Sequence, residues 1–443
     1  MKILQYALGL PPYRRGGLTR YSVDLSETLS KNNKVTFLYP GKMPFLPSSR
    51  LHFYEKKTKY HFRVIEMENP LPVSLGIGID SSAPYMEKRN KENIVSFLKN
   101  ENPDVIHIHT LMGLPIEFLE VAKKLNIKVV YTTHDFYGLC PKMLKKDALQ
   151  ELKNRKCTYD CMLCPNGPSL YKIKIMQSPI YATLKEKSFV KKMRKSQKQR
   201  VIDTVKMEVS EQEAQNRYRL RMYYIQMFKL IDVFHYNSST SKSYFRHFLP
   251  HSTGKVINIT HSGIHDNRNL DLIIKNSRIK FGYIGPYDKK KGFFELCKIM
   301  TQIRKEYKNF EVHFYGDILE EKIFKKEWAT NHGVVDSSQM KNVYKNIDIL
   351  IMPSKWHETF GFSVLEALSY GDICIVSKNV GAKDLLPSEF VFKDNNELIA
   401  KLTKILNKPL IINEYLKEVE KLNNLPFDFS SHVSSIINEI YKY

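Results

Sequence analysis

Two glutamates with a fixed spacing mark the part of the chain that is richest in candidate chemistry. Glu358 and Glu366 lie in the stretch HETFGFSVLEALSYGD, residues 357–372, with seven residues between them. A strand pattern precedes the stretch and a helical pattern begins near Phe362, so we expect Glu358 in a loop at a strand end and Glu366 in the first helical turns. Glu366 also fits a capping box with Ser363, which is a purely structural alternative. Capping does not explain Glu358.

Two junctions between a strand and a helix predict sites for phosphate. In the first, LGLPPYRRGGLTRYSV, the pair Gly16 and Gly17 lets the backbone approach a ligand just before a helix N-terminus, which attracts anions. In the second, YIGPYDKKKGFFEL, three lysines at 289–291 oppose the helix dipole unless an anion such as a diphosphate lies there. An ordinary turn and a solvated lysine loop are the structural alternatives.

The segments that must position these residues alternate between strand and helix patterns. The β-branched and aromatic runs are KILQYAL, KVTFLYP, DVIHIHT, IKVVYTTH and DVFHYNS in the first half, and KVINITHSG, IKFGYIG, FEVHFYG, IDILIMPS and ICIVSK in the second. Amphipathic segments separate them, which predicts an α/β fold with two doubly wound parallel sheets in tandem. A chain of 443 residues also exceeds the usual size of one core. The predicted domains are 1–250 and 251–425, divided near 248–255.

Two inserts interrupt this alternation in the first domain. Residues 51–68 predict a β-hairpin, and residues 165–230 predict a helical insert. Within the insert, residues 185–200 carry eight basic residues and one acidic residue around a short apolar stripe. A basic amphipathic helix of this kind can bind an anionic membrane surface. A solvated helix face that packs on the domain is the alternative.

The charge of the chain is strongly asymmetric. The net charge is +23, and residues 1–250 contain 42 Lys and Arg against 22 Asp and Glu, while residues 251–443 contain 27 against 24. Clustered positive charge favours an anionic lipid surface or nucleic acid as a partner, and a solvated surface is the alternative. The N-terminal run predicts a first strand rather than a signal peptide. We therefore expect a cytoplasmic protein, peripheral on the inner face of the plasma membrane.

Four of the six cysteines are clustered. Cys157, Cys161 and Cys164 have the spacing of metal ligands, and Cys140 could supply a fourth thiolate to a structural zinc ion. Reduced thiols without a metal are the alternative.

The ensemble of motifs resembles a known enzyme family. The stretch MPSKWHETFGFSVLEALSYG resembles the E-x7-E region of the retaining glycosyltransferases of family 4, and the resemblance extends to GGLTRY, DVIHIH, TTHDFYGLCP, ITHSGI, the Lys291-Gly292 pair and VHFYGD. It implies the GT-B architecture, in which two Rossmann-like domains face each other across a cleft, and a C-terminal helix, here 426–443, that crosses back to the first domain. The implied activity is retaining transfer of a hexose from a nucleotide-diphosphate sugar to a saccharide or lipid-linked acceptor, as in cell-surface polysaccharide biosynthesis.

The resemblance also implies roles for individual residues. Glu366 is expected to bind the ribose hydroxyls of the donor, and Glu358 the donor sugar, while Lys291 neutralises the leaving diphosphate. His134, in TTHDF, is expected at the sugar; a structural histidine at a strand end is the alternative. The expected diphosphate site is completed by the helix-start amides of Phe362, Ser363 and Val364 and by Gly16 and Gly17 from the first domain.

One departure from the family pattern affects this site. Pro286 stands where family members usually have an arginine, so the expectation is that Lys289 or Lys290 replaces that phosphate contact; the alternative is that the contact is absent. The implied reaction proceeds on one face of the sugar, with the departing phosphate oxygen taking the acceptor's proton. Catalysis is expected to come mainly from positioning and electrostatics. No metal is expected to be required, because lysine and helix N-termini neutralise the phosphate.

Two other functions stay open at this point. One is a GT-B enzyme of different chemistry, such as a sugar-nucleotide epimerase or a phosphorylase. The other is a nucleic-acid-binding protein that uses the basic half. Because no recognised nucleic-acid-binding module occurs in the sequence, we expect no nucleic-acid partner.

Overall fold

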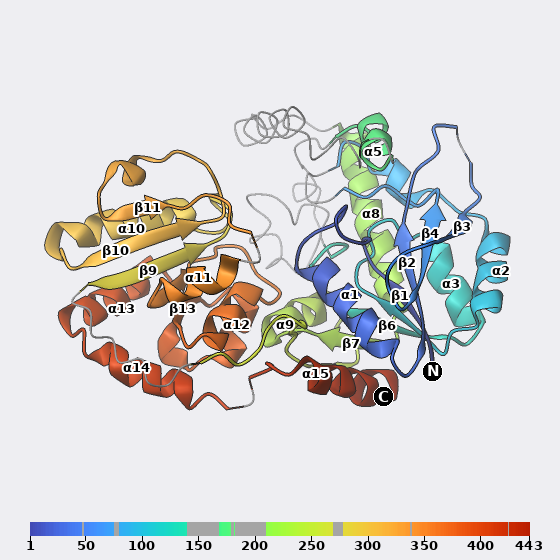
Figure 1. Ribbon diagram of the computed structural model, residues 1–443. Helices are drawn as coiled ribbons and strands as arrows, with labels where there is room; N and C mark the ends of the chain where they lie inside the picture. The colour runs from blue at the N-terminus through green and yellow to red at the C-terminus, as the bar shows by residue number, and fades with distance from the viewer. Residues whose placement is uncertain are drawn as a thin grey trace. The chain divides into compact units, whose positions relative to one another are not determined.

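The polypeptide forms two compact units. The computed structural model describes residues 1–46, 48–74, 79–139, 168–178, 181, 210–268, 278–336, 339–423 and 425–443. Unit 1 consists of Met1–Tyr236, Lys242–Ile257 and Val433–Tyr443, and unit 2 consists of Asn237–Ser241 and Asn258–His432. Each unit is built on its own sheet (Figure 1), which confirms the predicted α/β class with two doubly wound domains.

The sheet of unit 1 has eight strands in the order β3-β4-β2-β1-β5-β6-β7-β8. Their bounds are β1 (Lys2–Tyr6), β2 (Lys34–Pro40), β3 (His52–Lys56), β4 (Arg63–Glu68), β5 (Val105–Ile108), β6 (Lys128–Thr132), β7 (Val233–Tyr236) and β8 (Gly254–Val256). All neighbours pair in parallel except β3 and β4, which form an antiparallel pair within 51–68. The run KVINITHSG was predicted as a strand of the second sheet, but only its first two residues, Lys255 and Val256, are in a strand; they belong to β8, which pairs with β7 of the first sheet.

Helices cover the faces of this sheet because each carries an apolar stripe at helical spacing. In α1 (Gly17–Leu29), for example, Tyr21, Leu25 and Leu29 are buried at intervals of four residues. The other helical elements are η1 (Ala83–Met86), α2 (Lys91–Glu101), α3 (Ile116–Lys124), α5 (Leu170–Met176), α8 (Glu211–Lys229), α9 (Ser239–Phe248), α15 (Phe429–Ser435) and the π-helical turn η7 (Ile436–Tyr441).

The sheet of unit 2 has six parallel strands in the order β11-β10-β9-β12-β13-β14. Their bounds are β9 (Ile279–Ile284), β10 (Phe310–Tyr315), β11 (Ala329–Asn331), β12 (Ile349–Met352), β13 (Ile373–Ser377) and β14 (Val391–Phe392). The helical elements are α10 (Phe293–Glu306), η3 (Lys322–Lys325), α11 (Met340–Lys345), α12 (Phe362–Ser369), η5 (Gly381–Leu385), η6 (Ser388–Phe390), α13 (Asn395–Asn407) and α14 (Ile411–Glu420).

Each sheet has one point where the strand order reverses. In unit 1 the chain proceeds from β1 toward β2 on one side and β5 on the other; in unit 2 it proceeds from β9 toward β10 on one side and β12 on the other. Open α/β sheets bind ligands beyond the carboxyl ends of the strands at such a point. The strand order therefore marks the loops after β9 and β12, and those after β1 and β5, as candidate ligand sites.

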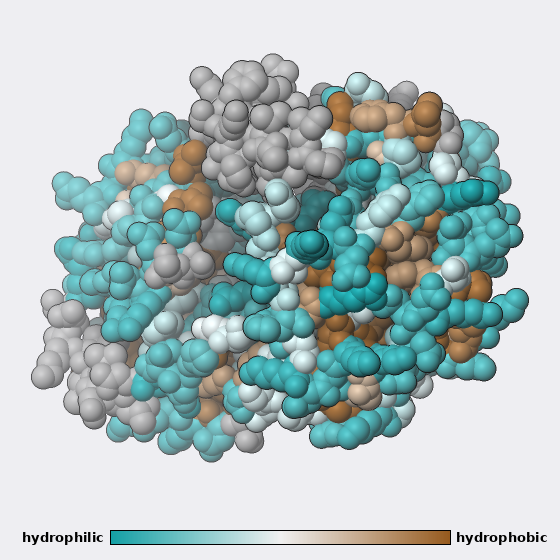
Figure 2. All heavy atoms as spheres, turned by 45° about the vertical axis from the view of Figure 1, so that its right-hand side comes forward, coloured by the Kyte–Doolittle hydropathy of each residue, from teal (hydrophilic) through white to brown (hydrophobic). Residues whose placement is uncertain are grey.

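The surface in Figure 2 is largely hydrophilic, with hydrophobic patches between the polar side chains. Within the described ranges, no helix combines the length and the apolar character needed to cross a bilayer. The basic segment 185–200 lies outside these ranges, as do Cys140, Cys157, Cys161 and Cys164.

Candidate active site

A cavity of about 250 Å³ lies at the switch point of the unit 2 sheet. Residues at and just beyond the carboxyl ends of β9 and β12, together with the start of α12, line it: Tyr283, Ile284, Gly285, Pro286, Lys291, Met352, Ser354, Glu358, Gly361, Phe362 and Ser363. Of the residues singled out in the sequence, Glu358, Lys291, Phe362 and Ser363 are thus brought together in one hollow.

Glu358 and Lys291 form an ion pair in this cavity. The ammonium of Lys291 meets Oε1 of Glu358, and the Ser354 hydroxyl donates to the same oxygen at 2.7 Å. The Glu358 side chain is only 14% exposed. A half-buried cation beside a carboxylate can bind a phosphate and a sugar hydroxyl at neighbouring positions, since the two side chains hold opposite charges in fixed places.

Close backbone packing fixes the loops that carry this pair. Glu358 forms a parallel bridge with Val380, and its amide donates to the carbonyl of Asn379 at 2.9 Å. Gly292, the residue before α10, has the left-handed conformation (φ 74°) and lies so close to the loop after β12 that a Cβ would overlap the carbonyl oxygen of Pro353. Lys291 is therefore held against that loop by its neighbour in the sequence.

The N-terminus of α12 opens into the same cavity. Gly361, with φ 110°, ends the loop and α12 begins at Phe362. The predicted capping box is wrong: Ser363 lies inside the first turn, not before it, and its hydroxyl faces the Met352 sulfur at 3.9 Å. Of the three amides expected at the diphosphate, that of Val364 already donates to the Gly361 carbonyl at 3.1 Å.

Glu366 has two protein donors instead of a backbone cap. The Tyr344 hydroxyl donates to Oε2 at 2.7 Å, and His261 Nε2 contacts Oε1 at 3.2 Å. The amide of Gly263 donates to His261 Nδ1 at 3.2 Å, so the ring proton is on Nε2 and is donated to Glu366. A carboxylate accepts about four hydrogen bonds, so capacity for ligand hydroxyls remains. His261 and Tyr344 were not predicted as site residues, because nothing in their local sequence indicates a contact with Glu366.

Lys290 lies beside the cavity rather than in its lining. Its ammonium stands over the Trp356 ring at 5.0 Å, and its carbonyl accepts the amides of Lys355 and Trp356. Burial lowers the pKa of Lys290 to about 8. Lys289 is exposed. Pro286 lines the cavity at the position of the family's arginine and has no side-chain donor.

Gly16, Gly17 and His134 belong to unit 1. Gly16 precedes α1 with φ 117°, a conformation that favours glycine, and α1 begins at Gly17. His134 follows β6, and its Nε2 lies 3.1 Å from Nδ1 of His109, which follows β5. Gly16 thus ends the loop after β1, Gly17 begins α1, and His134 lies on the loop after β6.

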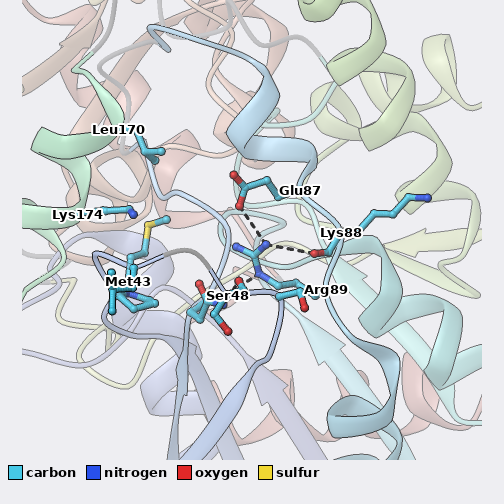
Figure 3. Close-up of a pocket in the computed structure, with 11 residues that line it drawn as sticks. Met43, Ser48, Glu87, Lys88, Arg89, Leu170 and Lys174 are labelled. Carbon is cyan, nitrogen blue, oxygen red and sulfur yellow. Dashed lines mark hydrogen bonds and ion pairs between the residues drawn. The ribbon is translucent and has the colours of Figure 1, made fainter.

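A second cavity, of about 460 Å³, lies beyond the carboxyl ends of β2 and β4 in unit 1. Figure 3 shows Met43, Ser48, Leu170 and Lys174 around it, with the Arg89 guanidinium directed at Glu87. Arg89 is 4% exposed and donates to the carbonyl of Asn69 at 3.0 Å. The cavity combines apolar side chains with cationic ones.

Comparison with known families decides the class of this protein. The family described as "Glycosyl transferases group 1" matches residues 270–422, which include the whole cavity of unit 2, and the family described as "Glycosyltransferase Family 4" matches residues 15–165 of unit 1. The chain is a glycosyltransferase with the GT-B fold.

Relatives of this glycosyltransferase cover nearly its whole length. A protein of Klebsiella pneumoniae named "Uncharacterized 42.6 kDa protein in cps region" is 22% identical over 434 residues, which cover 92% of this chain and 96% of that protein. Sucrose-phosphate synthase from Thermosynechococcus elongatus has a similar structure (TM-score 0.57, 16% identity, 99% and 98% of the two chains). So has Anabaena Alr3699/HepE in complex with UDP (TM-score 0.58, 14% identity, 100% of both chains).

Proposed function

We propose that this glycosyltransferase transfers a hexose from a nucleotide-diphosphate sugar with retention of configuration. The observation that carries the proposal is the cavity of unit 2, where the Lys291–Glu358 pair and the start of α12 meet at the switch point of a parallel sheet. A cation and a helix N-terminus suit a diphosphate, and a buried carboxylate suits sugar hydroxyls. The similar Anabaena protein was solved in complex with UDP and with UDP-glucose, which supports this choice of donor.

In the proposed reaction, Lys291 and the amides of Phe362 and Ser363 hold the diphosphate. The bond between the anomeric carbon and the phosphate oxygen breaks, and the acceptor oxygen bonds to the anomeric carbon on the same face. The acceptor's proton passes to the departing phosphate oxygen. Glu358 stabilises the positive charge that develops at the anomeric carbon, and Lys291 the negative charge on the phosphate, so we propose that transfer requires no metal.

The remaining site residues take the roles that the family resemblance implies. Glu366, oriented by His261 and Tyr344, binds the ribose hydroxyls. Lys290 substitutes for the arginine that Pro286 replaces. Gly16 and Gly17 approach the diphosphate, and His134 contacts the donor sugar.

We propose a saccharide or lipid-linked acceptor, in cell-surface polysaccharide biosynthesis. The relative named from a cps region of Klebsiella pneumoniae supports this setting. The cavity beyond β2 and β4, with Lys88 and Lys174 beside Met43 and Leu170, offers both a cationic and an apolar lining for such an acceptor. The positive charge of residues 1–250 supports peripheral binding to an anionic membrane. Flotation with anionic liposomes tests this, and binding that survives neutralisation of 185–200 would reject that segment as the anchor.

Thermal unfolding in the presence of UDP-, GDP- and ADP-sugars tests the proposed donor. We expect one nucleotide class to raise the unfolding temperature, and Glu366→Ala to abolish the rise because the ribose loses its acceptor. Glu418→Ala is the matched control, since Glu418 belongs to the same unit, its side chain is 42% exposed and its ion pair is with Lys421. If no nucleotide sugar stabilises the protein, the proposed function is wrong.

A further inference from the structure

Four large apolar side chains are exposed at one place on unit 1. Phe45 and Leu46, in the loop after β2, are 59% and 81% exposed. On α5, Tyr171 and Ile175 are 64% and 37% exposed. The ring centroids of Phe45 and Tyr171 lie 6.0 Å apart, so the loop and the helix bring apolar side chains to the same surface. Exposed hydrophobic side chains that cluster, unlike single ones, mark interaction sites. These four residues are called the α5 patch.

Hydrogen bonds fix α5 at this place. Tyr171 and Ile175 are four residues apart, so they lie on one face of the helix. Where α5 ends, the side-chain amide of Gln177 donates to the carbonyl of Gly41 at 3.1 Å, and its oxygen accepts from the amide of Val73 at 3.0 Å. Gly41 follows β2 and Val73 follows β4, so α5 lies over loops at the carboxyl ends of these strands (Figure 1). The position of the α5 patch on unit 1 is therefore set by the fold.

Three lysines adjoin the α5 patch. Lys172 is exposed on α5. The Lys174 ammonium donates to the Phe45 carbonyl at 3.2 Å, where the loop meets the helix. Lys88 is exposed at the cavity that the loop and α5 also line. Among the residues that the structure describes, no carboxylate pairs with any of these three lysines. The patch thus combines apolar side chains with positive charge that no described residue neutralises.

This combination favours an anionic bilayer over a protein as the partner. Lysines are attracted to anionic head groups, and apolar side chains gain by leaving water for the acyl-chain boundary. Glu87, the carboxylate in the lining of the adjoining cavity, is already paired with Arg89 at 3.2 Å and leaves the lysines free to bind lipid. A second copy of this chain is disfavoured, because two facing patches would bring their lysines together and residues 1–250 contain 42 Lys and Arg against 22 Asp and Glu.

We propose that the α5 patch is the surface by which unit 1 docks on an anionic phospholipid bilayer. The proposal rests on the proposed membrane association and assigns it to α5 and the loop after β2 rather than to residues 185–200. The apolar side chains enter the boundary between head groups and acyl chains, and the lysines contact lipid phosphates. Leu46 and Lys174 also line the cavity beyond β2 and β4 (Figure 3), so docking brings that cavity to the lipid surface, where a lipid-linked acceptor lies.

Binding of the full-length protein to lipid vesicles tests the docking surface. We expect binding to vesicles of phosphatidylglycerol and phosphatidylcholine, and much weaker binding to phosphatidylcholine alone, because the lysines need anionic lipid. In Leu46→Ser we expect an affinity about tenfold lower for the anionic vesicles, since the side chain no longer enters the apolar phase. Leu410→Ser is the matched control: Leu410, in unit 2, is 79% exposed, and we expect wild-type affinity.

Two further variants test the aromatic and the cationic part of the patch. Tyr171→Ser should weaken vesicle binding as Leu46→Ser does, and it provides a second test should Leu46→Ser fail to fold. Lys172→Gln should lower the affinity about fivefold because one cation near the lipid surface is lost. Its control is Lys305→Gln, at an exposed lysine of α10, which should bind like the wild type.

Wild-type affinity in both Leu46→Ser and Tyr171→Ser would overturn the docking surface and leave membrane binding to another segment. A changed oligomeric state in Leu46→Ser, with unchanged vesicle affinity, would also overturn it, because the patch would then be a contact between copies of the chain. If the wild-type protein binds no vesicles, the docking surface and the proposed membrane association both fail, while nucleotide binding still decides the transferase function.

Discussion

At the scale of single residues, the Lys291–Glu358 pair is the most direct test of the proposed chemistry. In Glu358→Gln the side chain keeps its size but loses the charge that faces Lys291 and the developing positive charge of the sugar. We expect kcat to fall about 10²-fold, as when one preorganised electrostatic contact is lost, with nucleotide affinity nearly unchanged. Steady-state kinetics and calorimetric titration with the nucleotide measure the two quantities.

The matched control for this variant is Glu418→Gln, on α14, since the side chain of Glu418 is 42% exposed. It should leave both quantities at their wild-type values. Wild-type transfer by Glu358→Gln, with the nucleotide still bound, would contradict the assignment of Glu358 to the sugar.

The lowered pKa of Lys290 predicts how the affinity for the nucleotide depends on pH. Because burial lowers its pKa to about 8, the free protein loses this cation as the pH rises through 8, whereas a bound diphosphate keeps it protonated. Affinity should therefore be nearly constant below about pH 7, fall to about half at pH 8 and to about a tenth at pH 9, where about a tenth of the free Lys290 remains protonated. Titrations from pH 7 to pH 9 measure this.

Variants of two neighbouring lysines show whether Lys290 causes the decline in affinity. Lys290→Ala should remove most of the decline, and the exposed Lys289→Ala should retain it. An equal decline in Lys290→Ala would show that another group carries the pH dependence.

The sequence predicted several of the residues that line the cavity, but it did not predict the hydrogen bonds that position them. Glu358 and Lys291 were identified from a spacing motif and a lysine-rich junction, both of which are local signals. The partners of Glu366 were not, because His261 is 105 residues away in the chain. The Ser363 cap was predicted from a local pattern and is wrong, since α12 begins one residue before Ser363 and places it inside the first turn.

At the scale of the elements, two glycines with nearly the same backbone conformation allow a controlled test of how α10 is anchored. Gly292 has φ 74° and Gly333 has φ 71°, but only at Gly292 would a Cβ overlap backbone, the Pro353 carbonyl. Gly333→Ala should cost about 1–2 kcal/mol of unfolding free energy from backbone strain, and Gly292→Ala more than about 3 kcal/mol. Denaturant unfolding measures both. Equal costs would show that the contact with Pro353 is easily relaxed.

Most strands were predictable because their β-branched and aromatic runs must be buried between helices on both faces. The run KVINITHSG shows the limit of that reasoning. Only Lys255 and Val256 of this run form a strand, together with Gly254, and pairing with β7 places that strand in the first sheet, a choice made by distant contacts. Local propensity indicates that a strand forms, and tertiary structure decides which sheet it joins.

At the scale of the whole molecule, residues 433–443 belong to unit 1 although they follow unit 2 in the chain. Ile440 is fully buried there, so Ile440→Ala should destabilise unit 1 by about 2–5 kcal/mol. Hydrogen exchange should become faster in β5 and β6 and stay unchanged in β9 and β12. The exposed Lys442→Ala should match the wild type. Equal loss of protection in the strands of both units would contradict this assignment of residues 433–443.

The membership of residues 433–443 in unit 1 has a consequence for the order in which the protein is made. The ribosome completes β1 to β8 long before it adds Tyr441, and in the meantime His107 and Gln5 lack the hydroxyl that joins them. A nascent chain released within unit 2 therefore has a first sheet in which Tyr441 does not yet join Gln5 and His107. That contact forms only after all of unit 2 has been synthesised, so premature termination within unit 2 leaves both units defective.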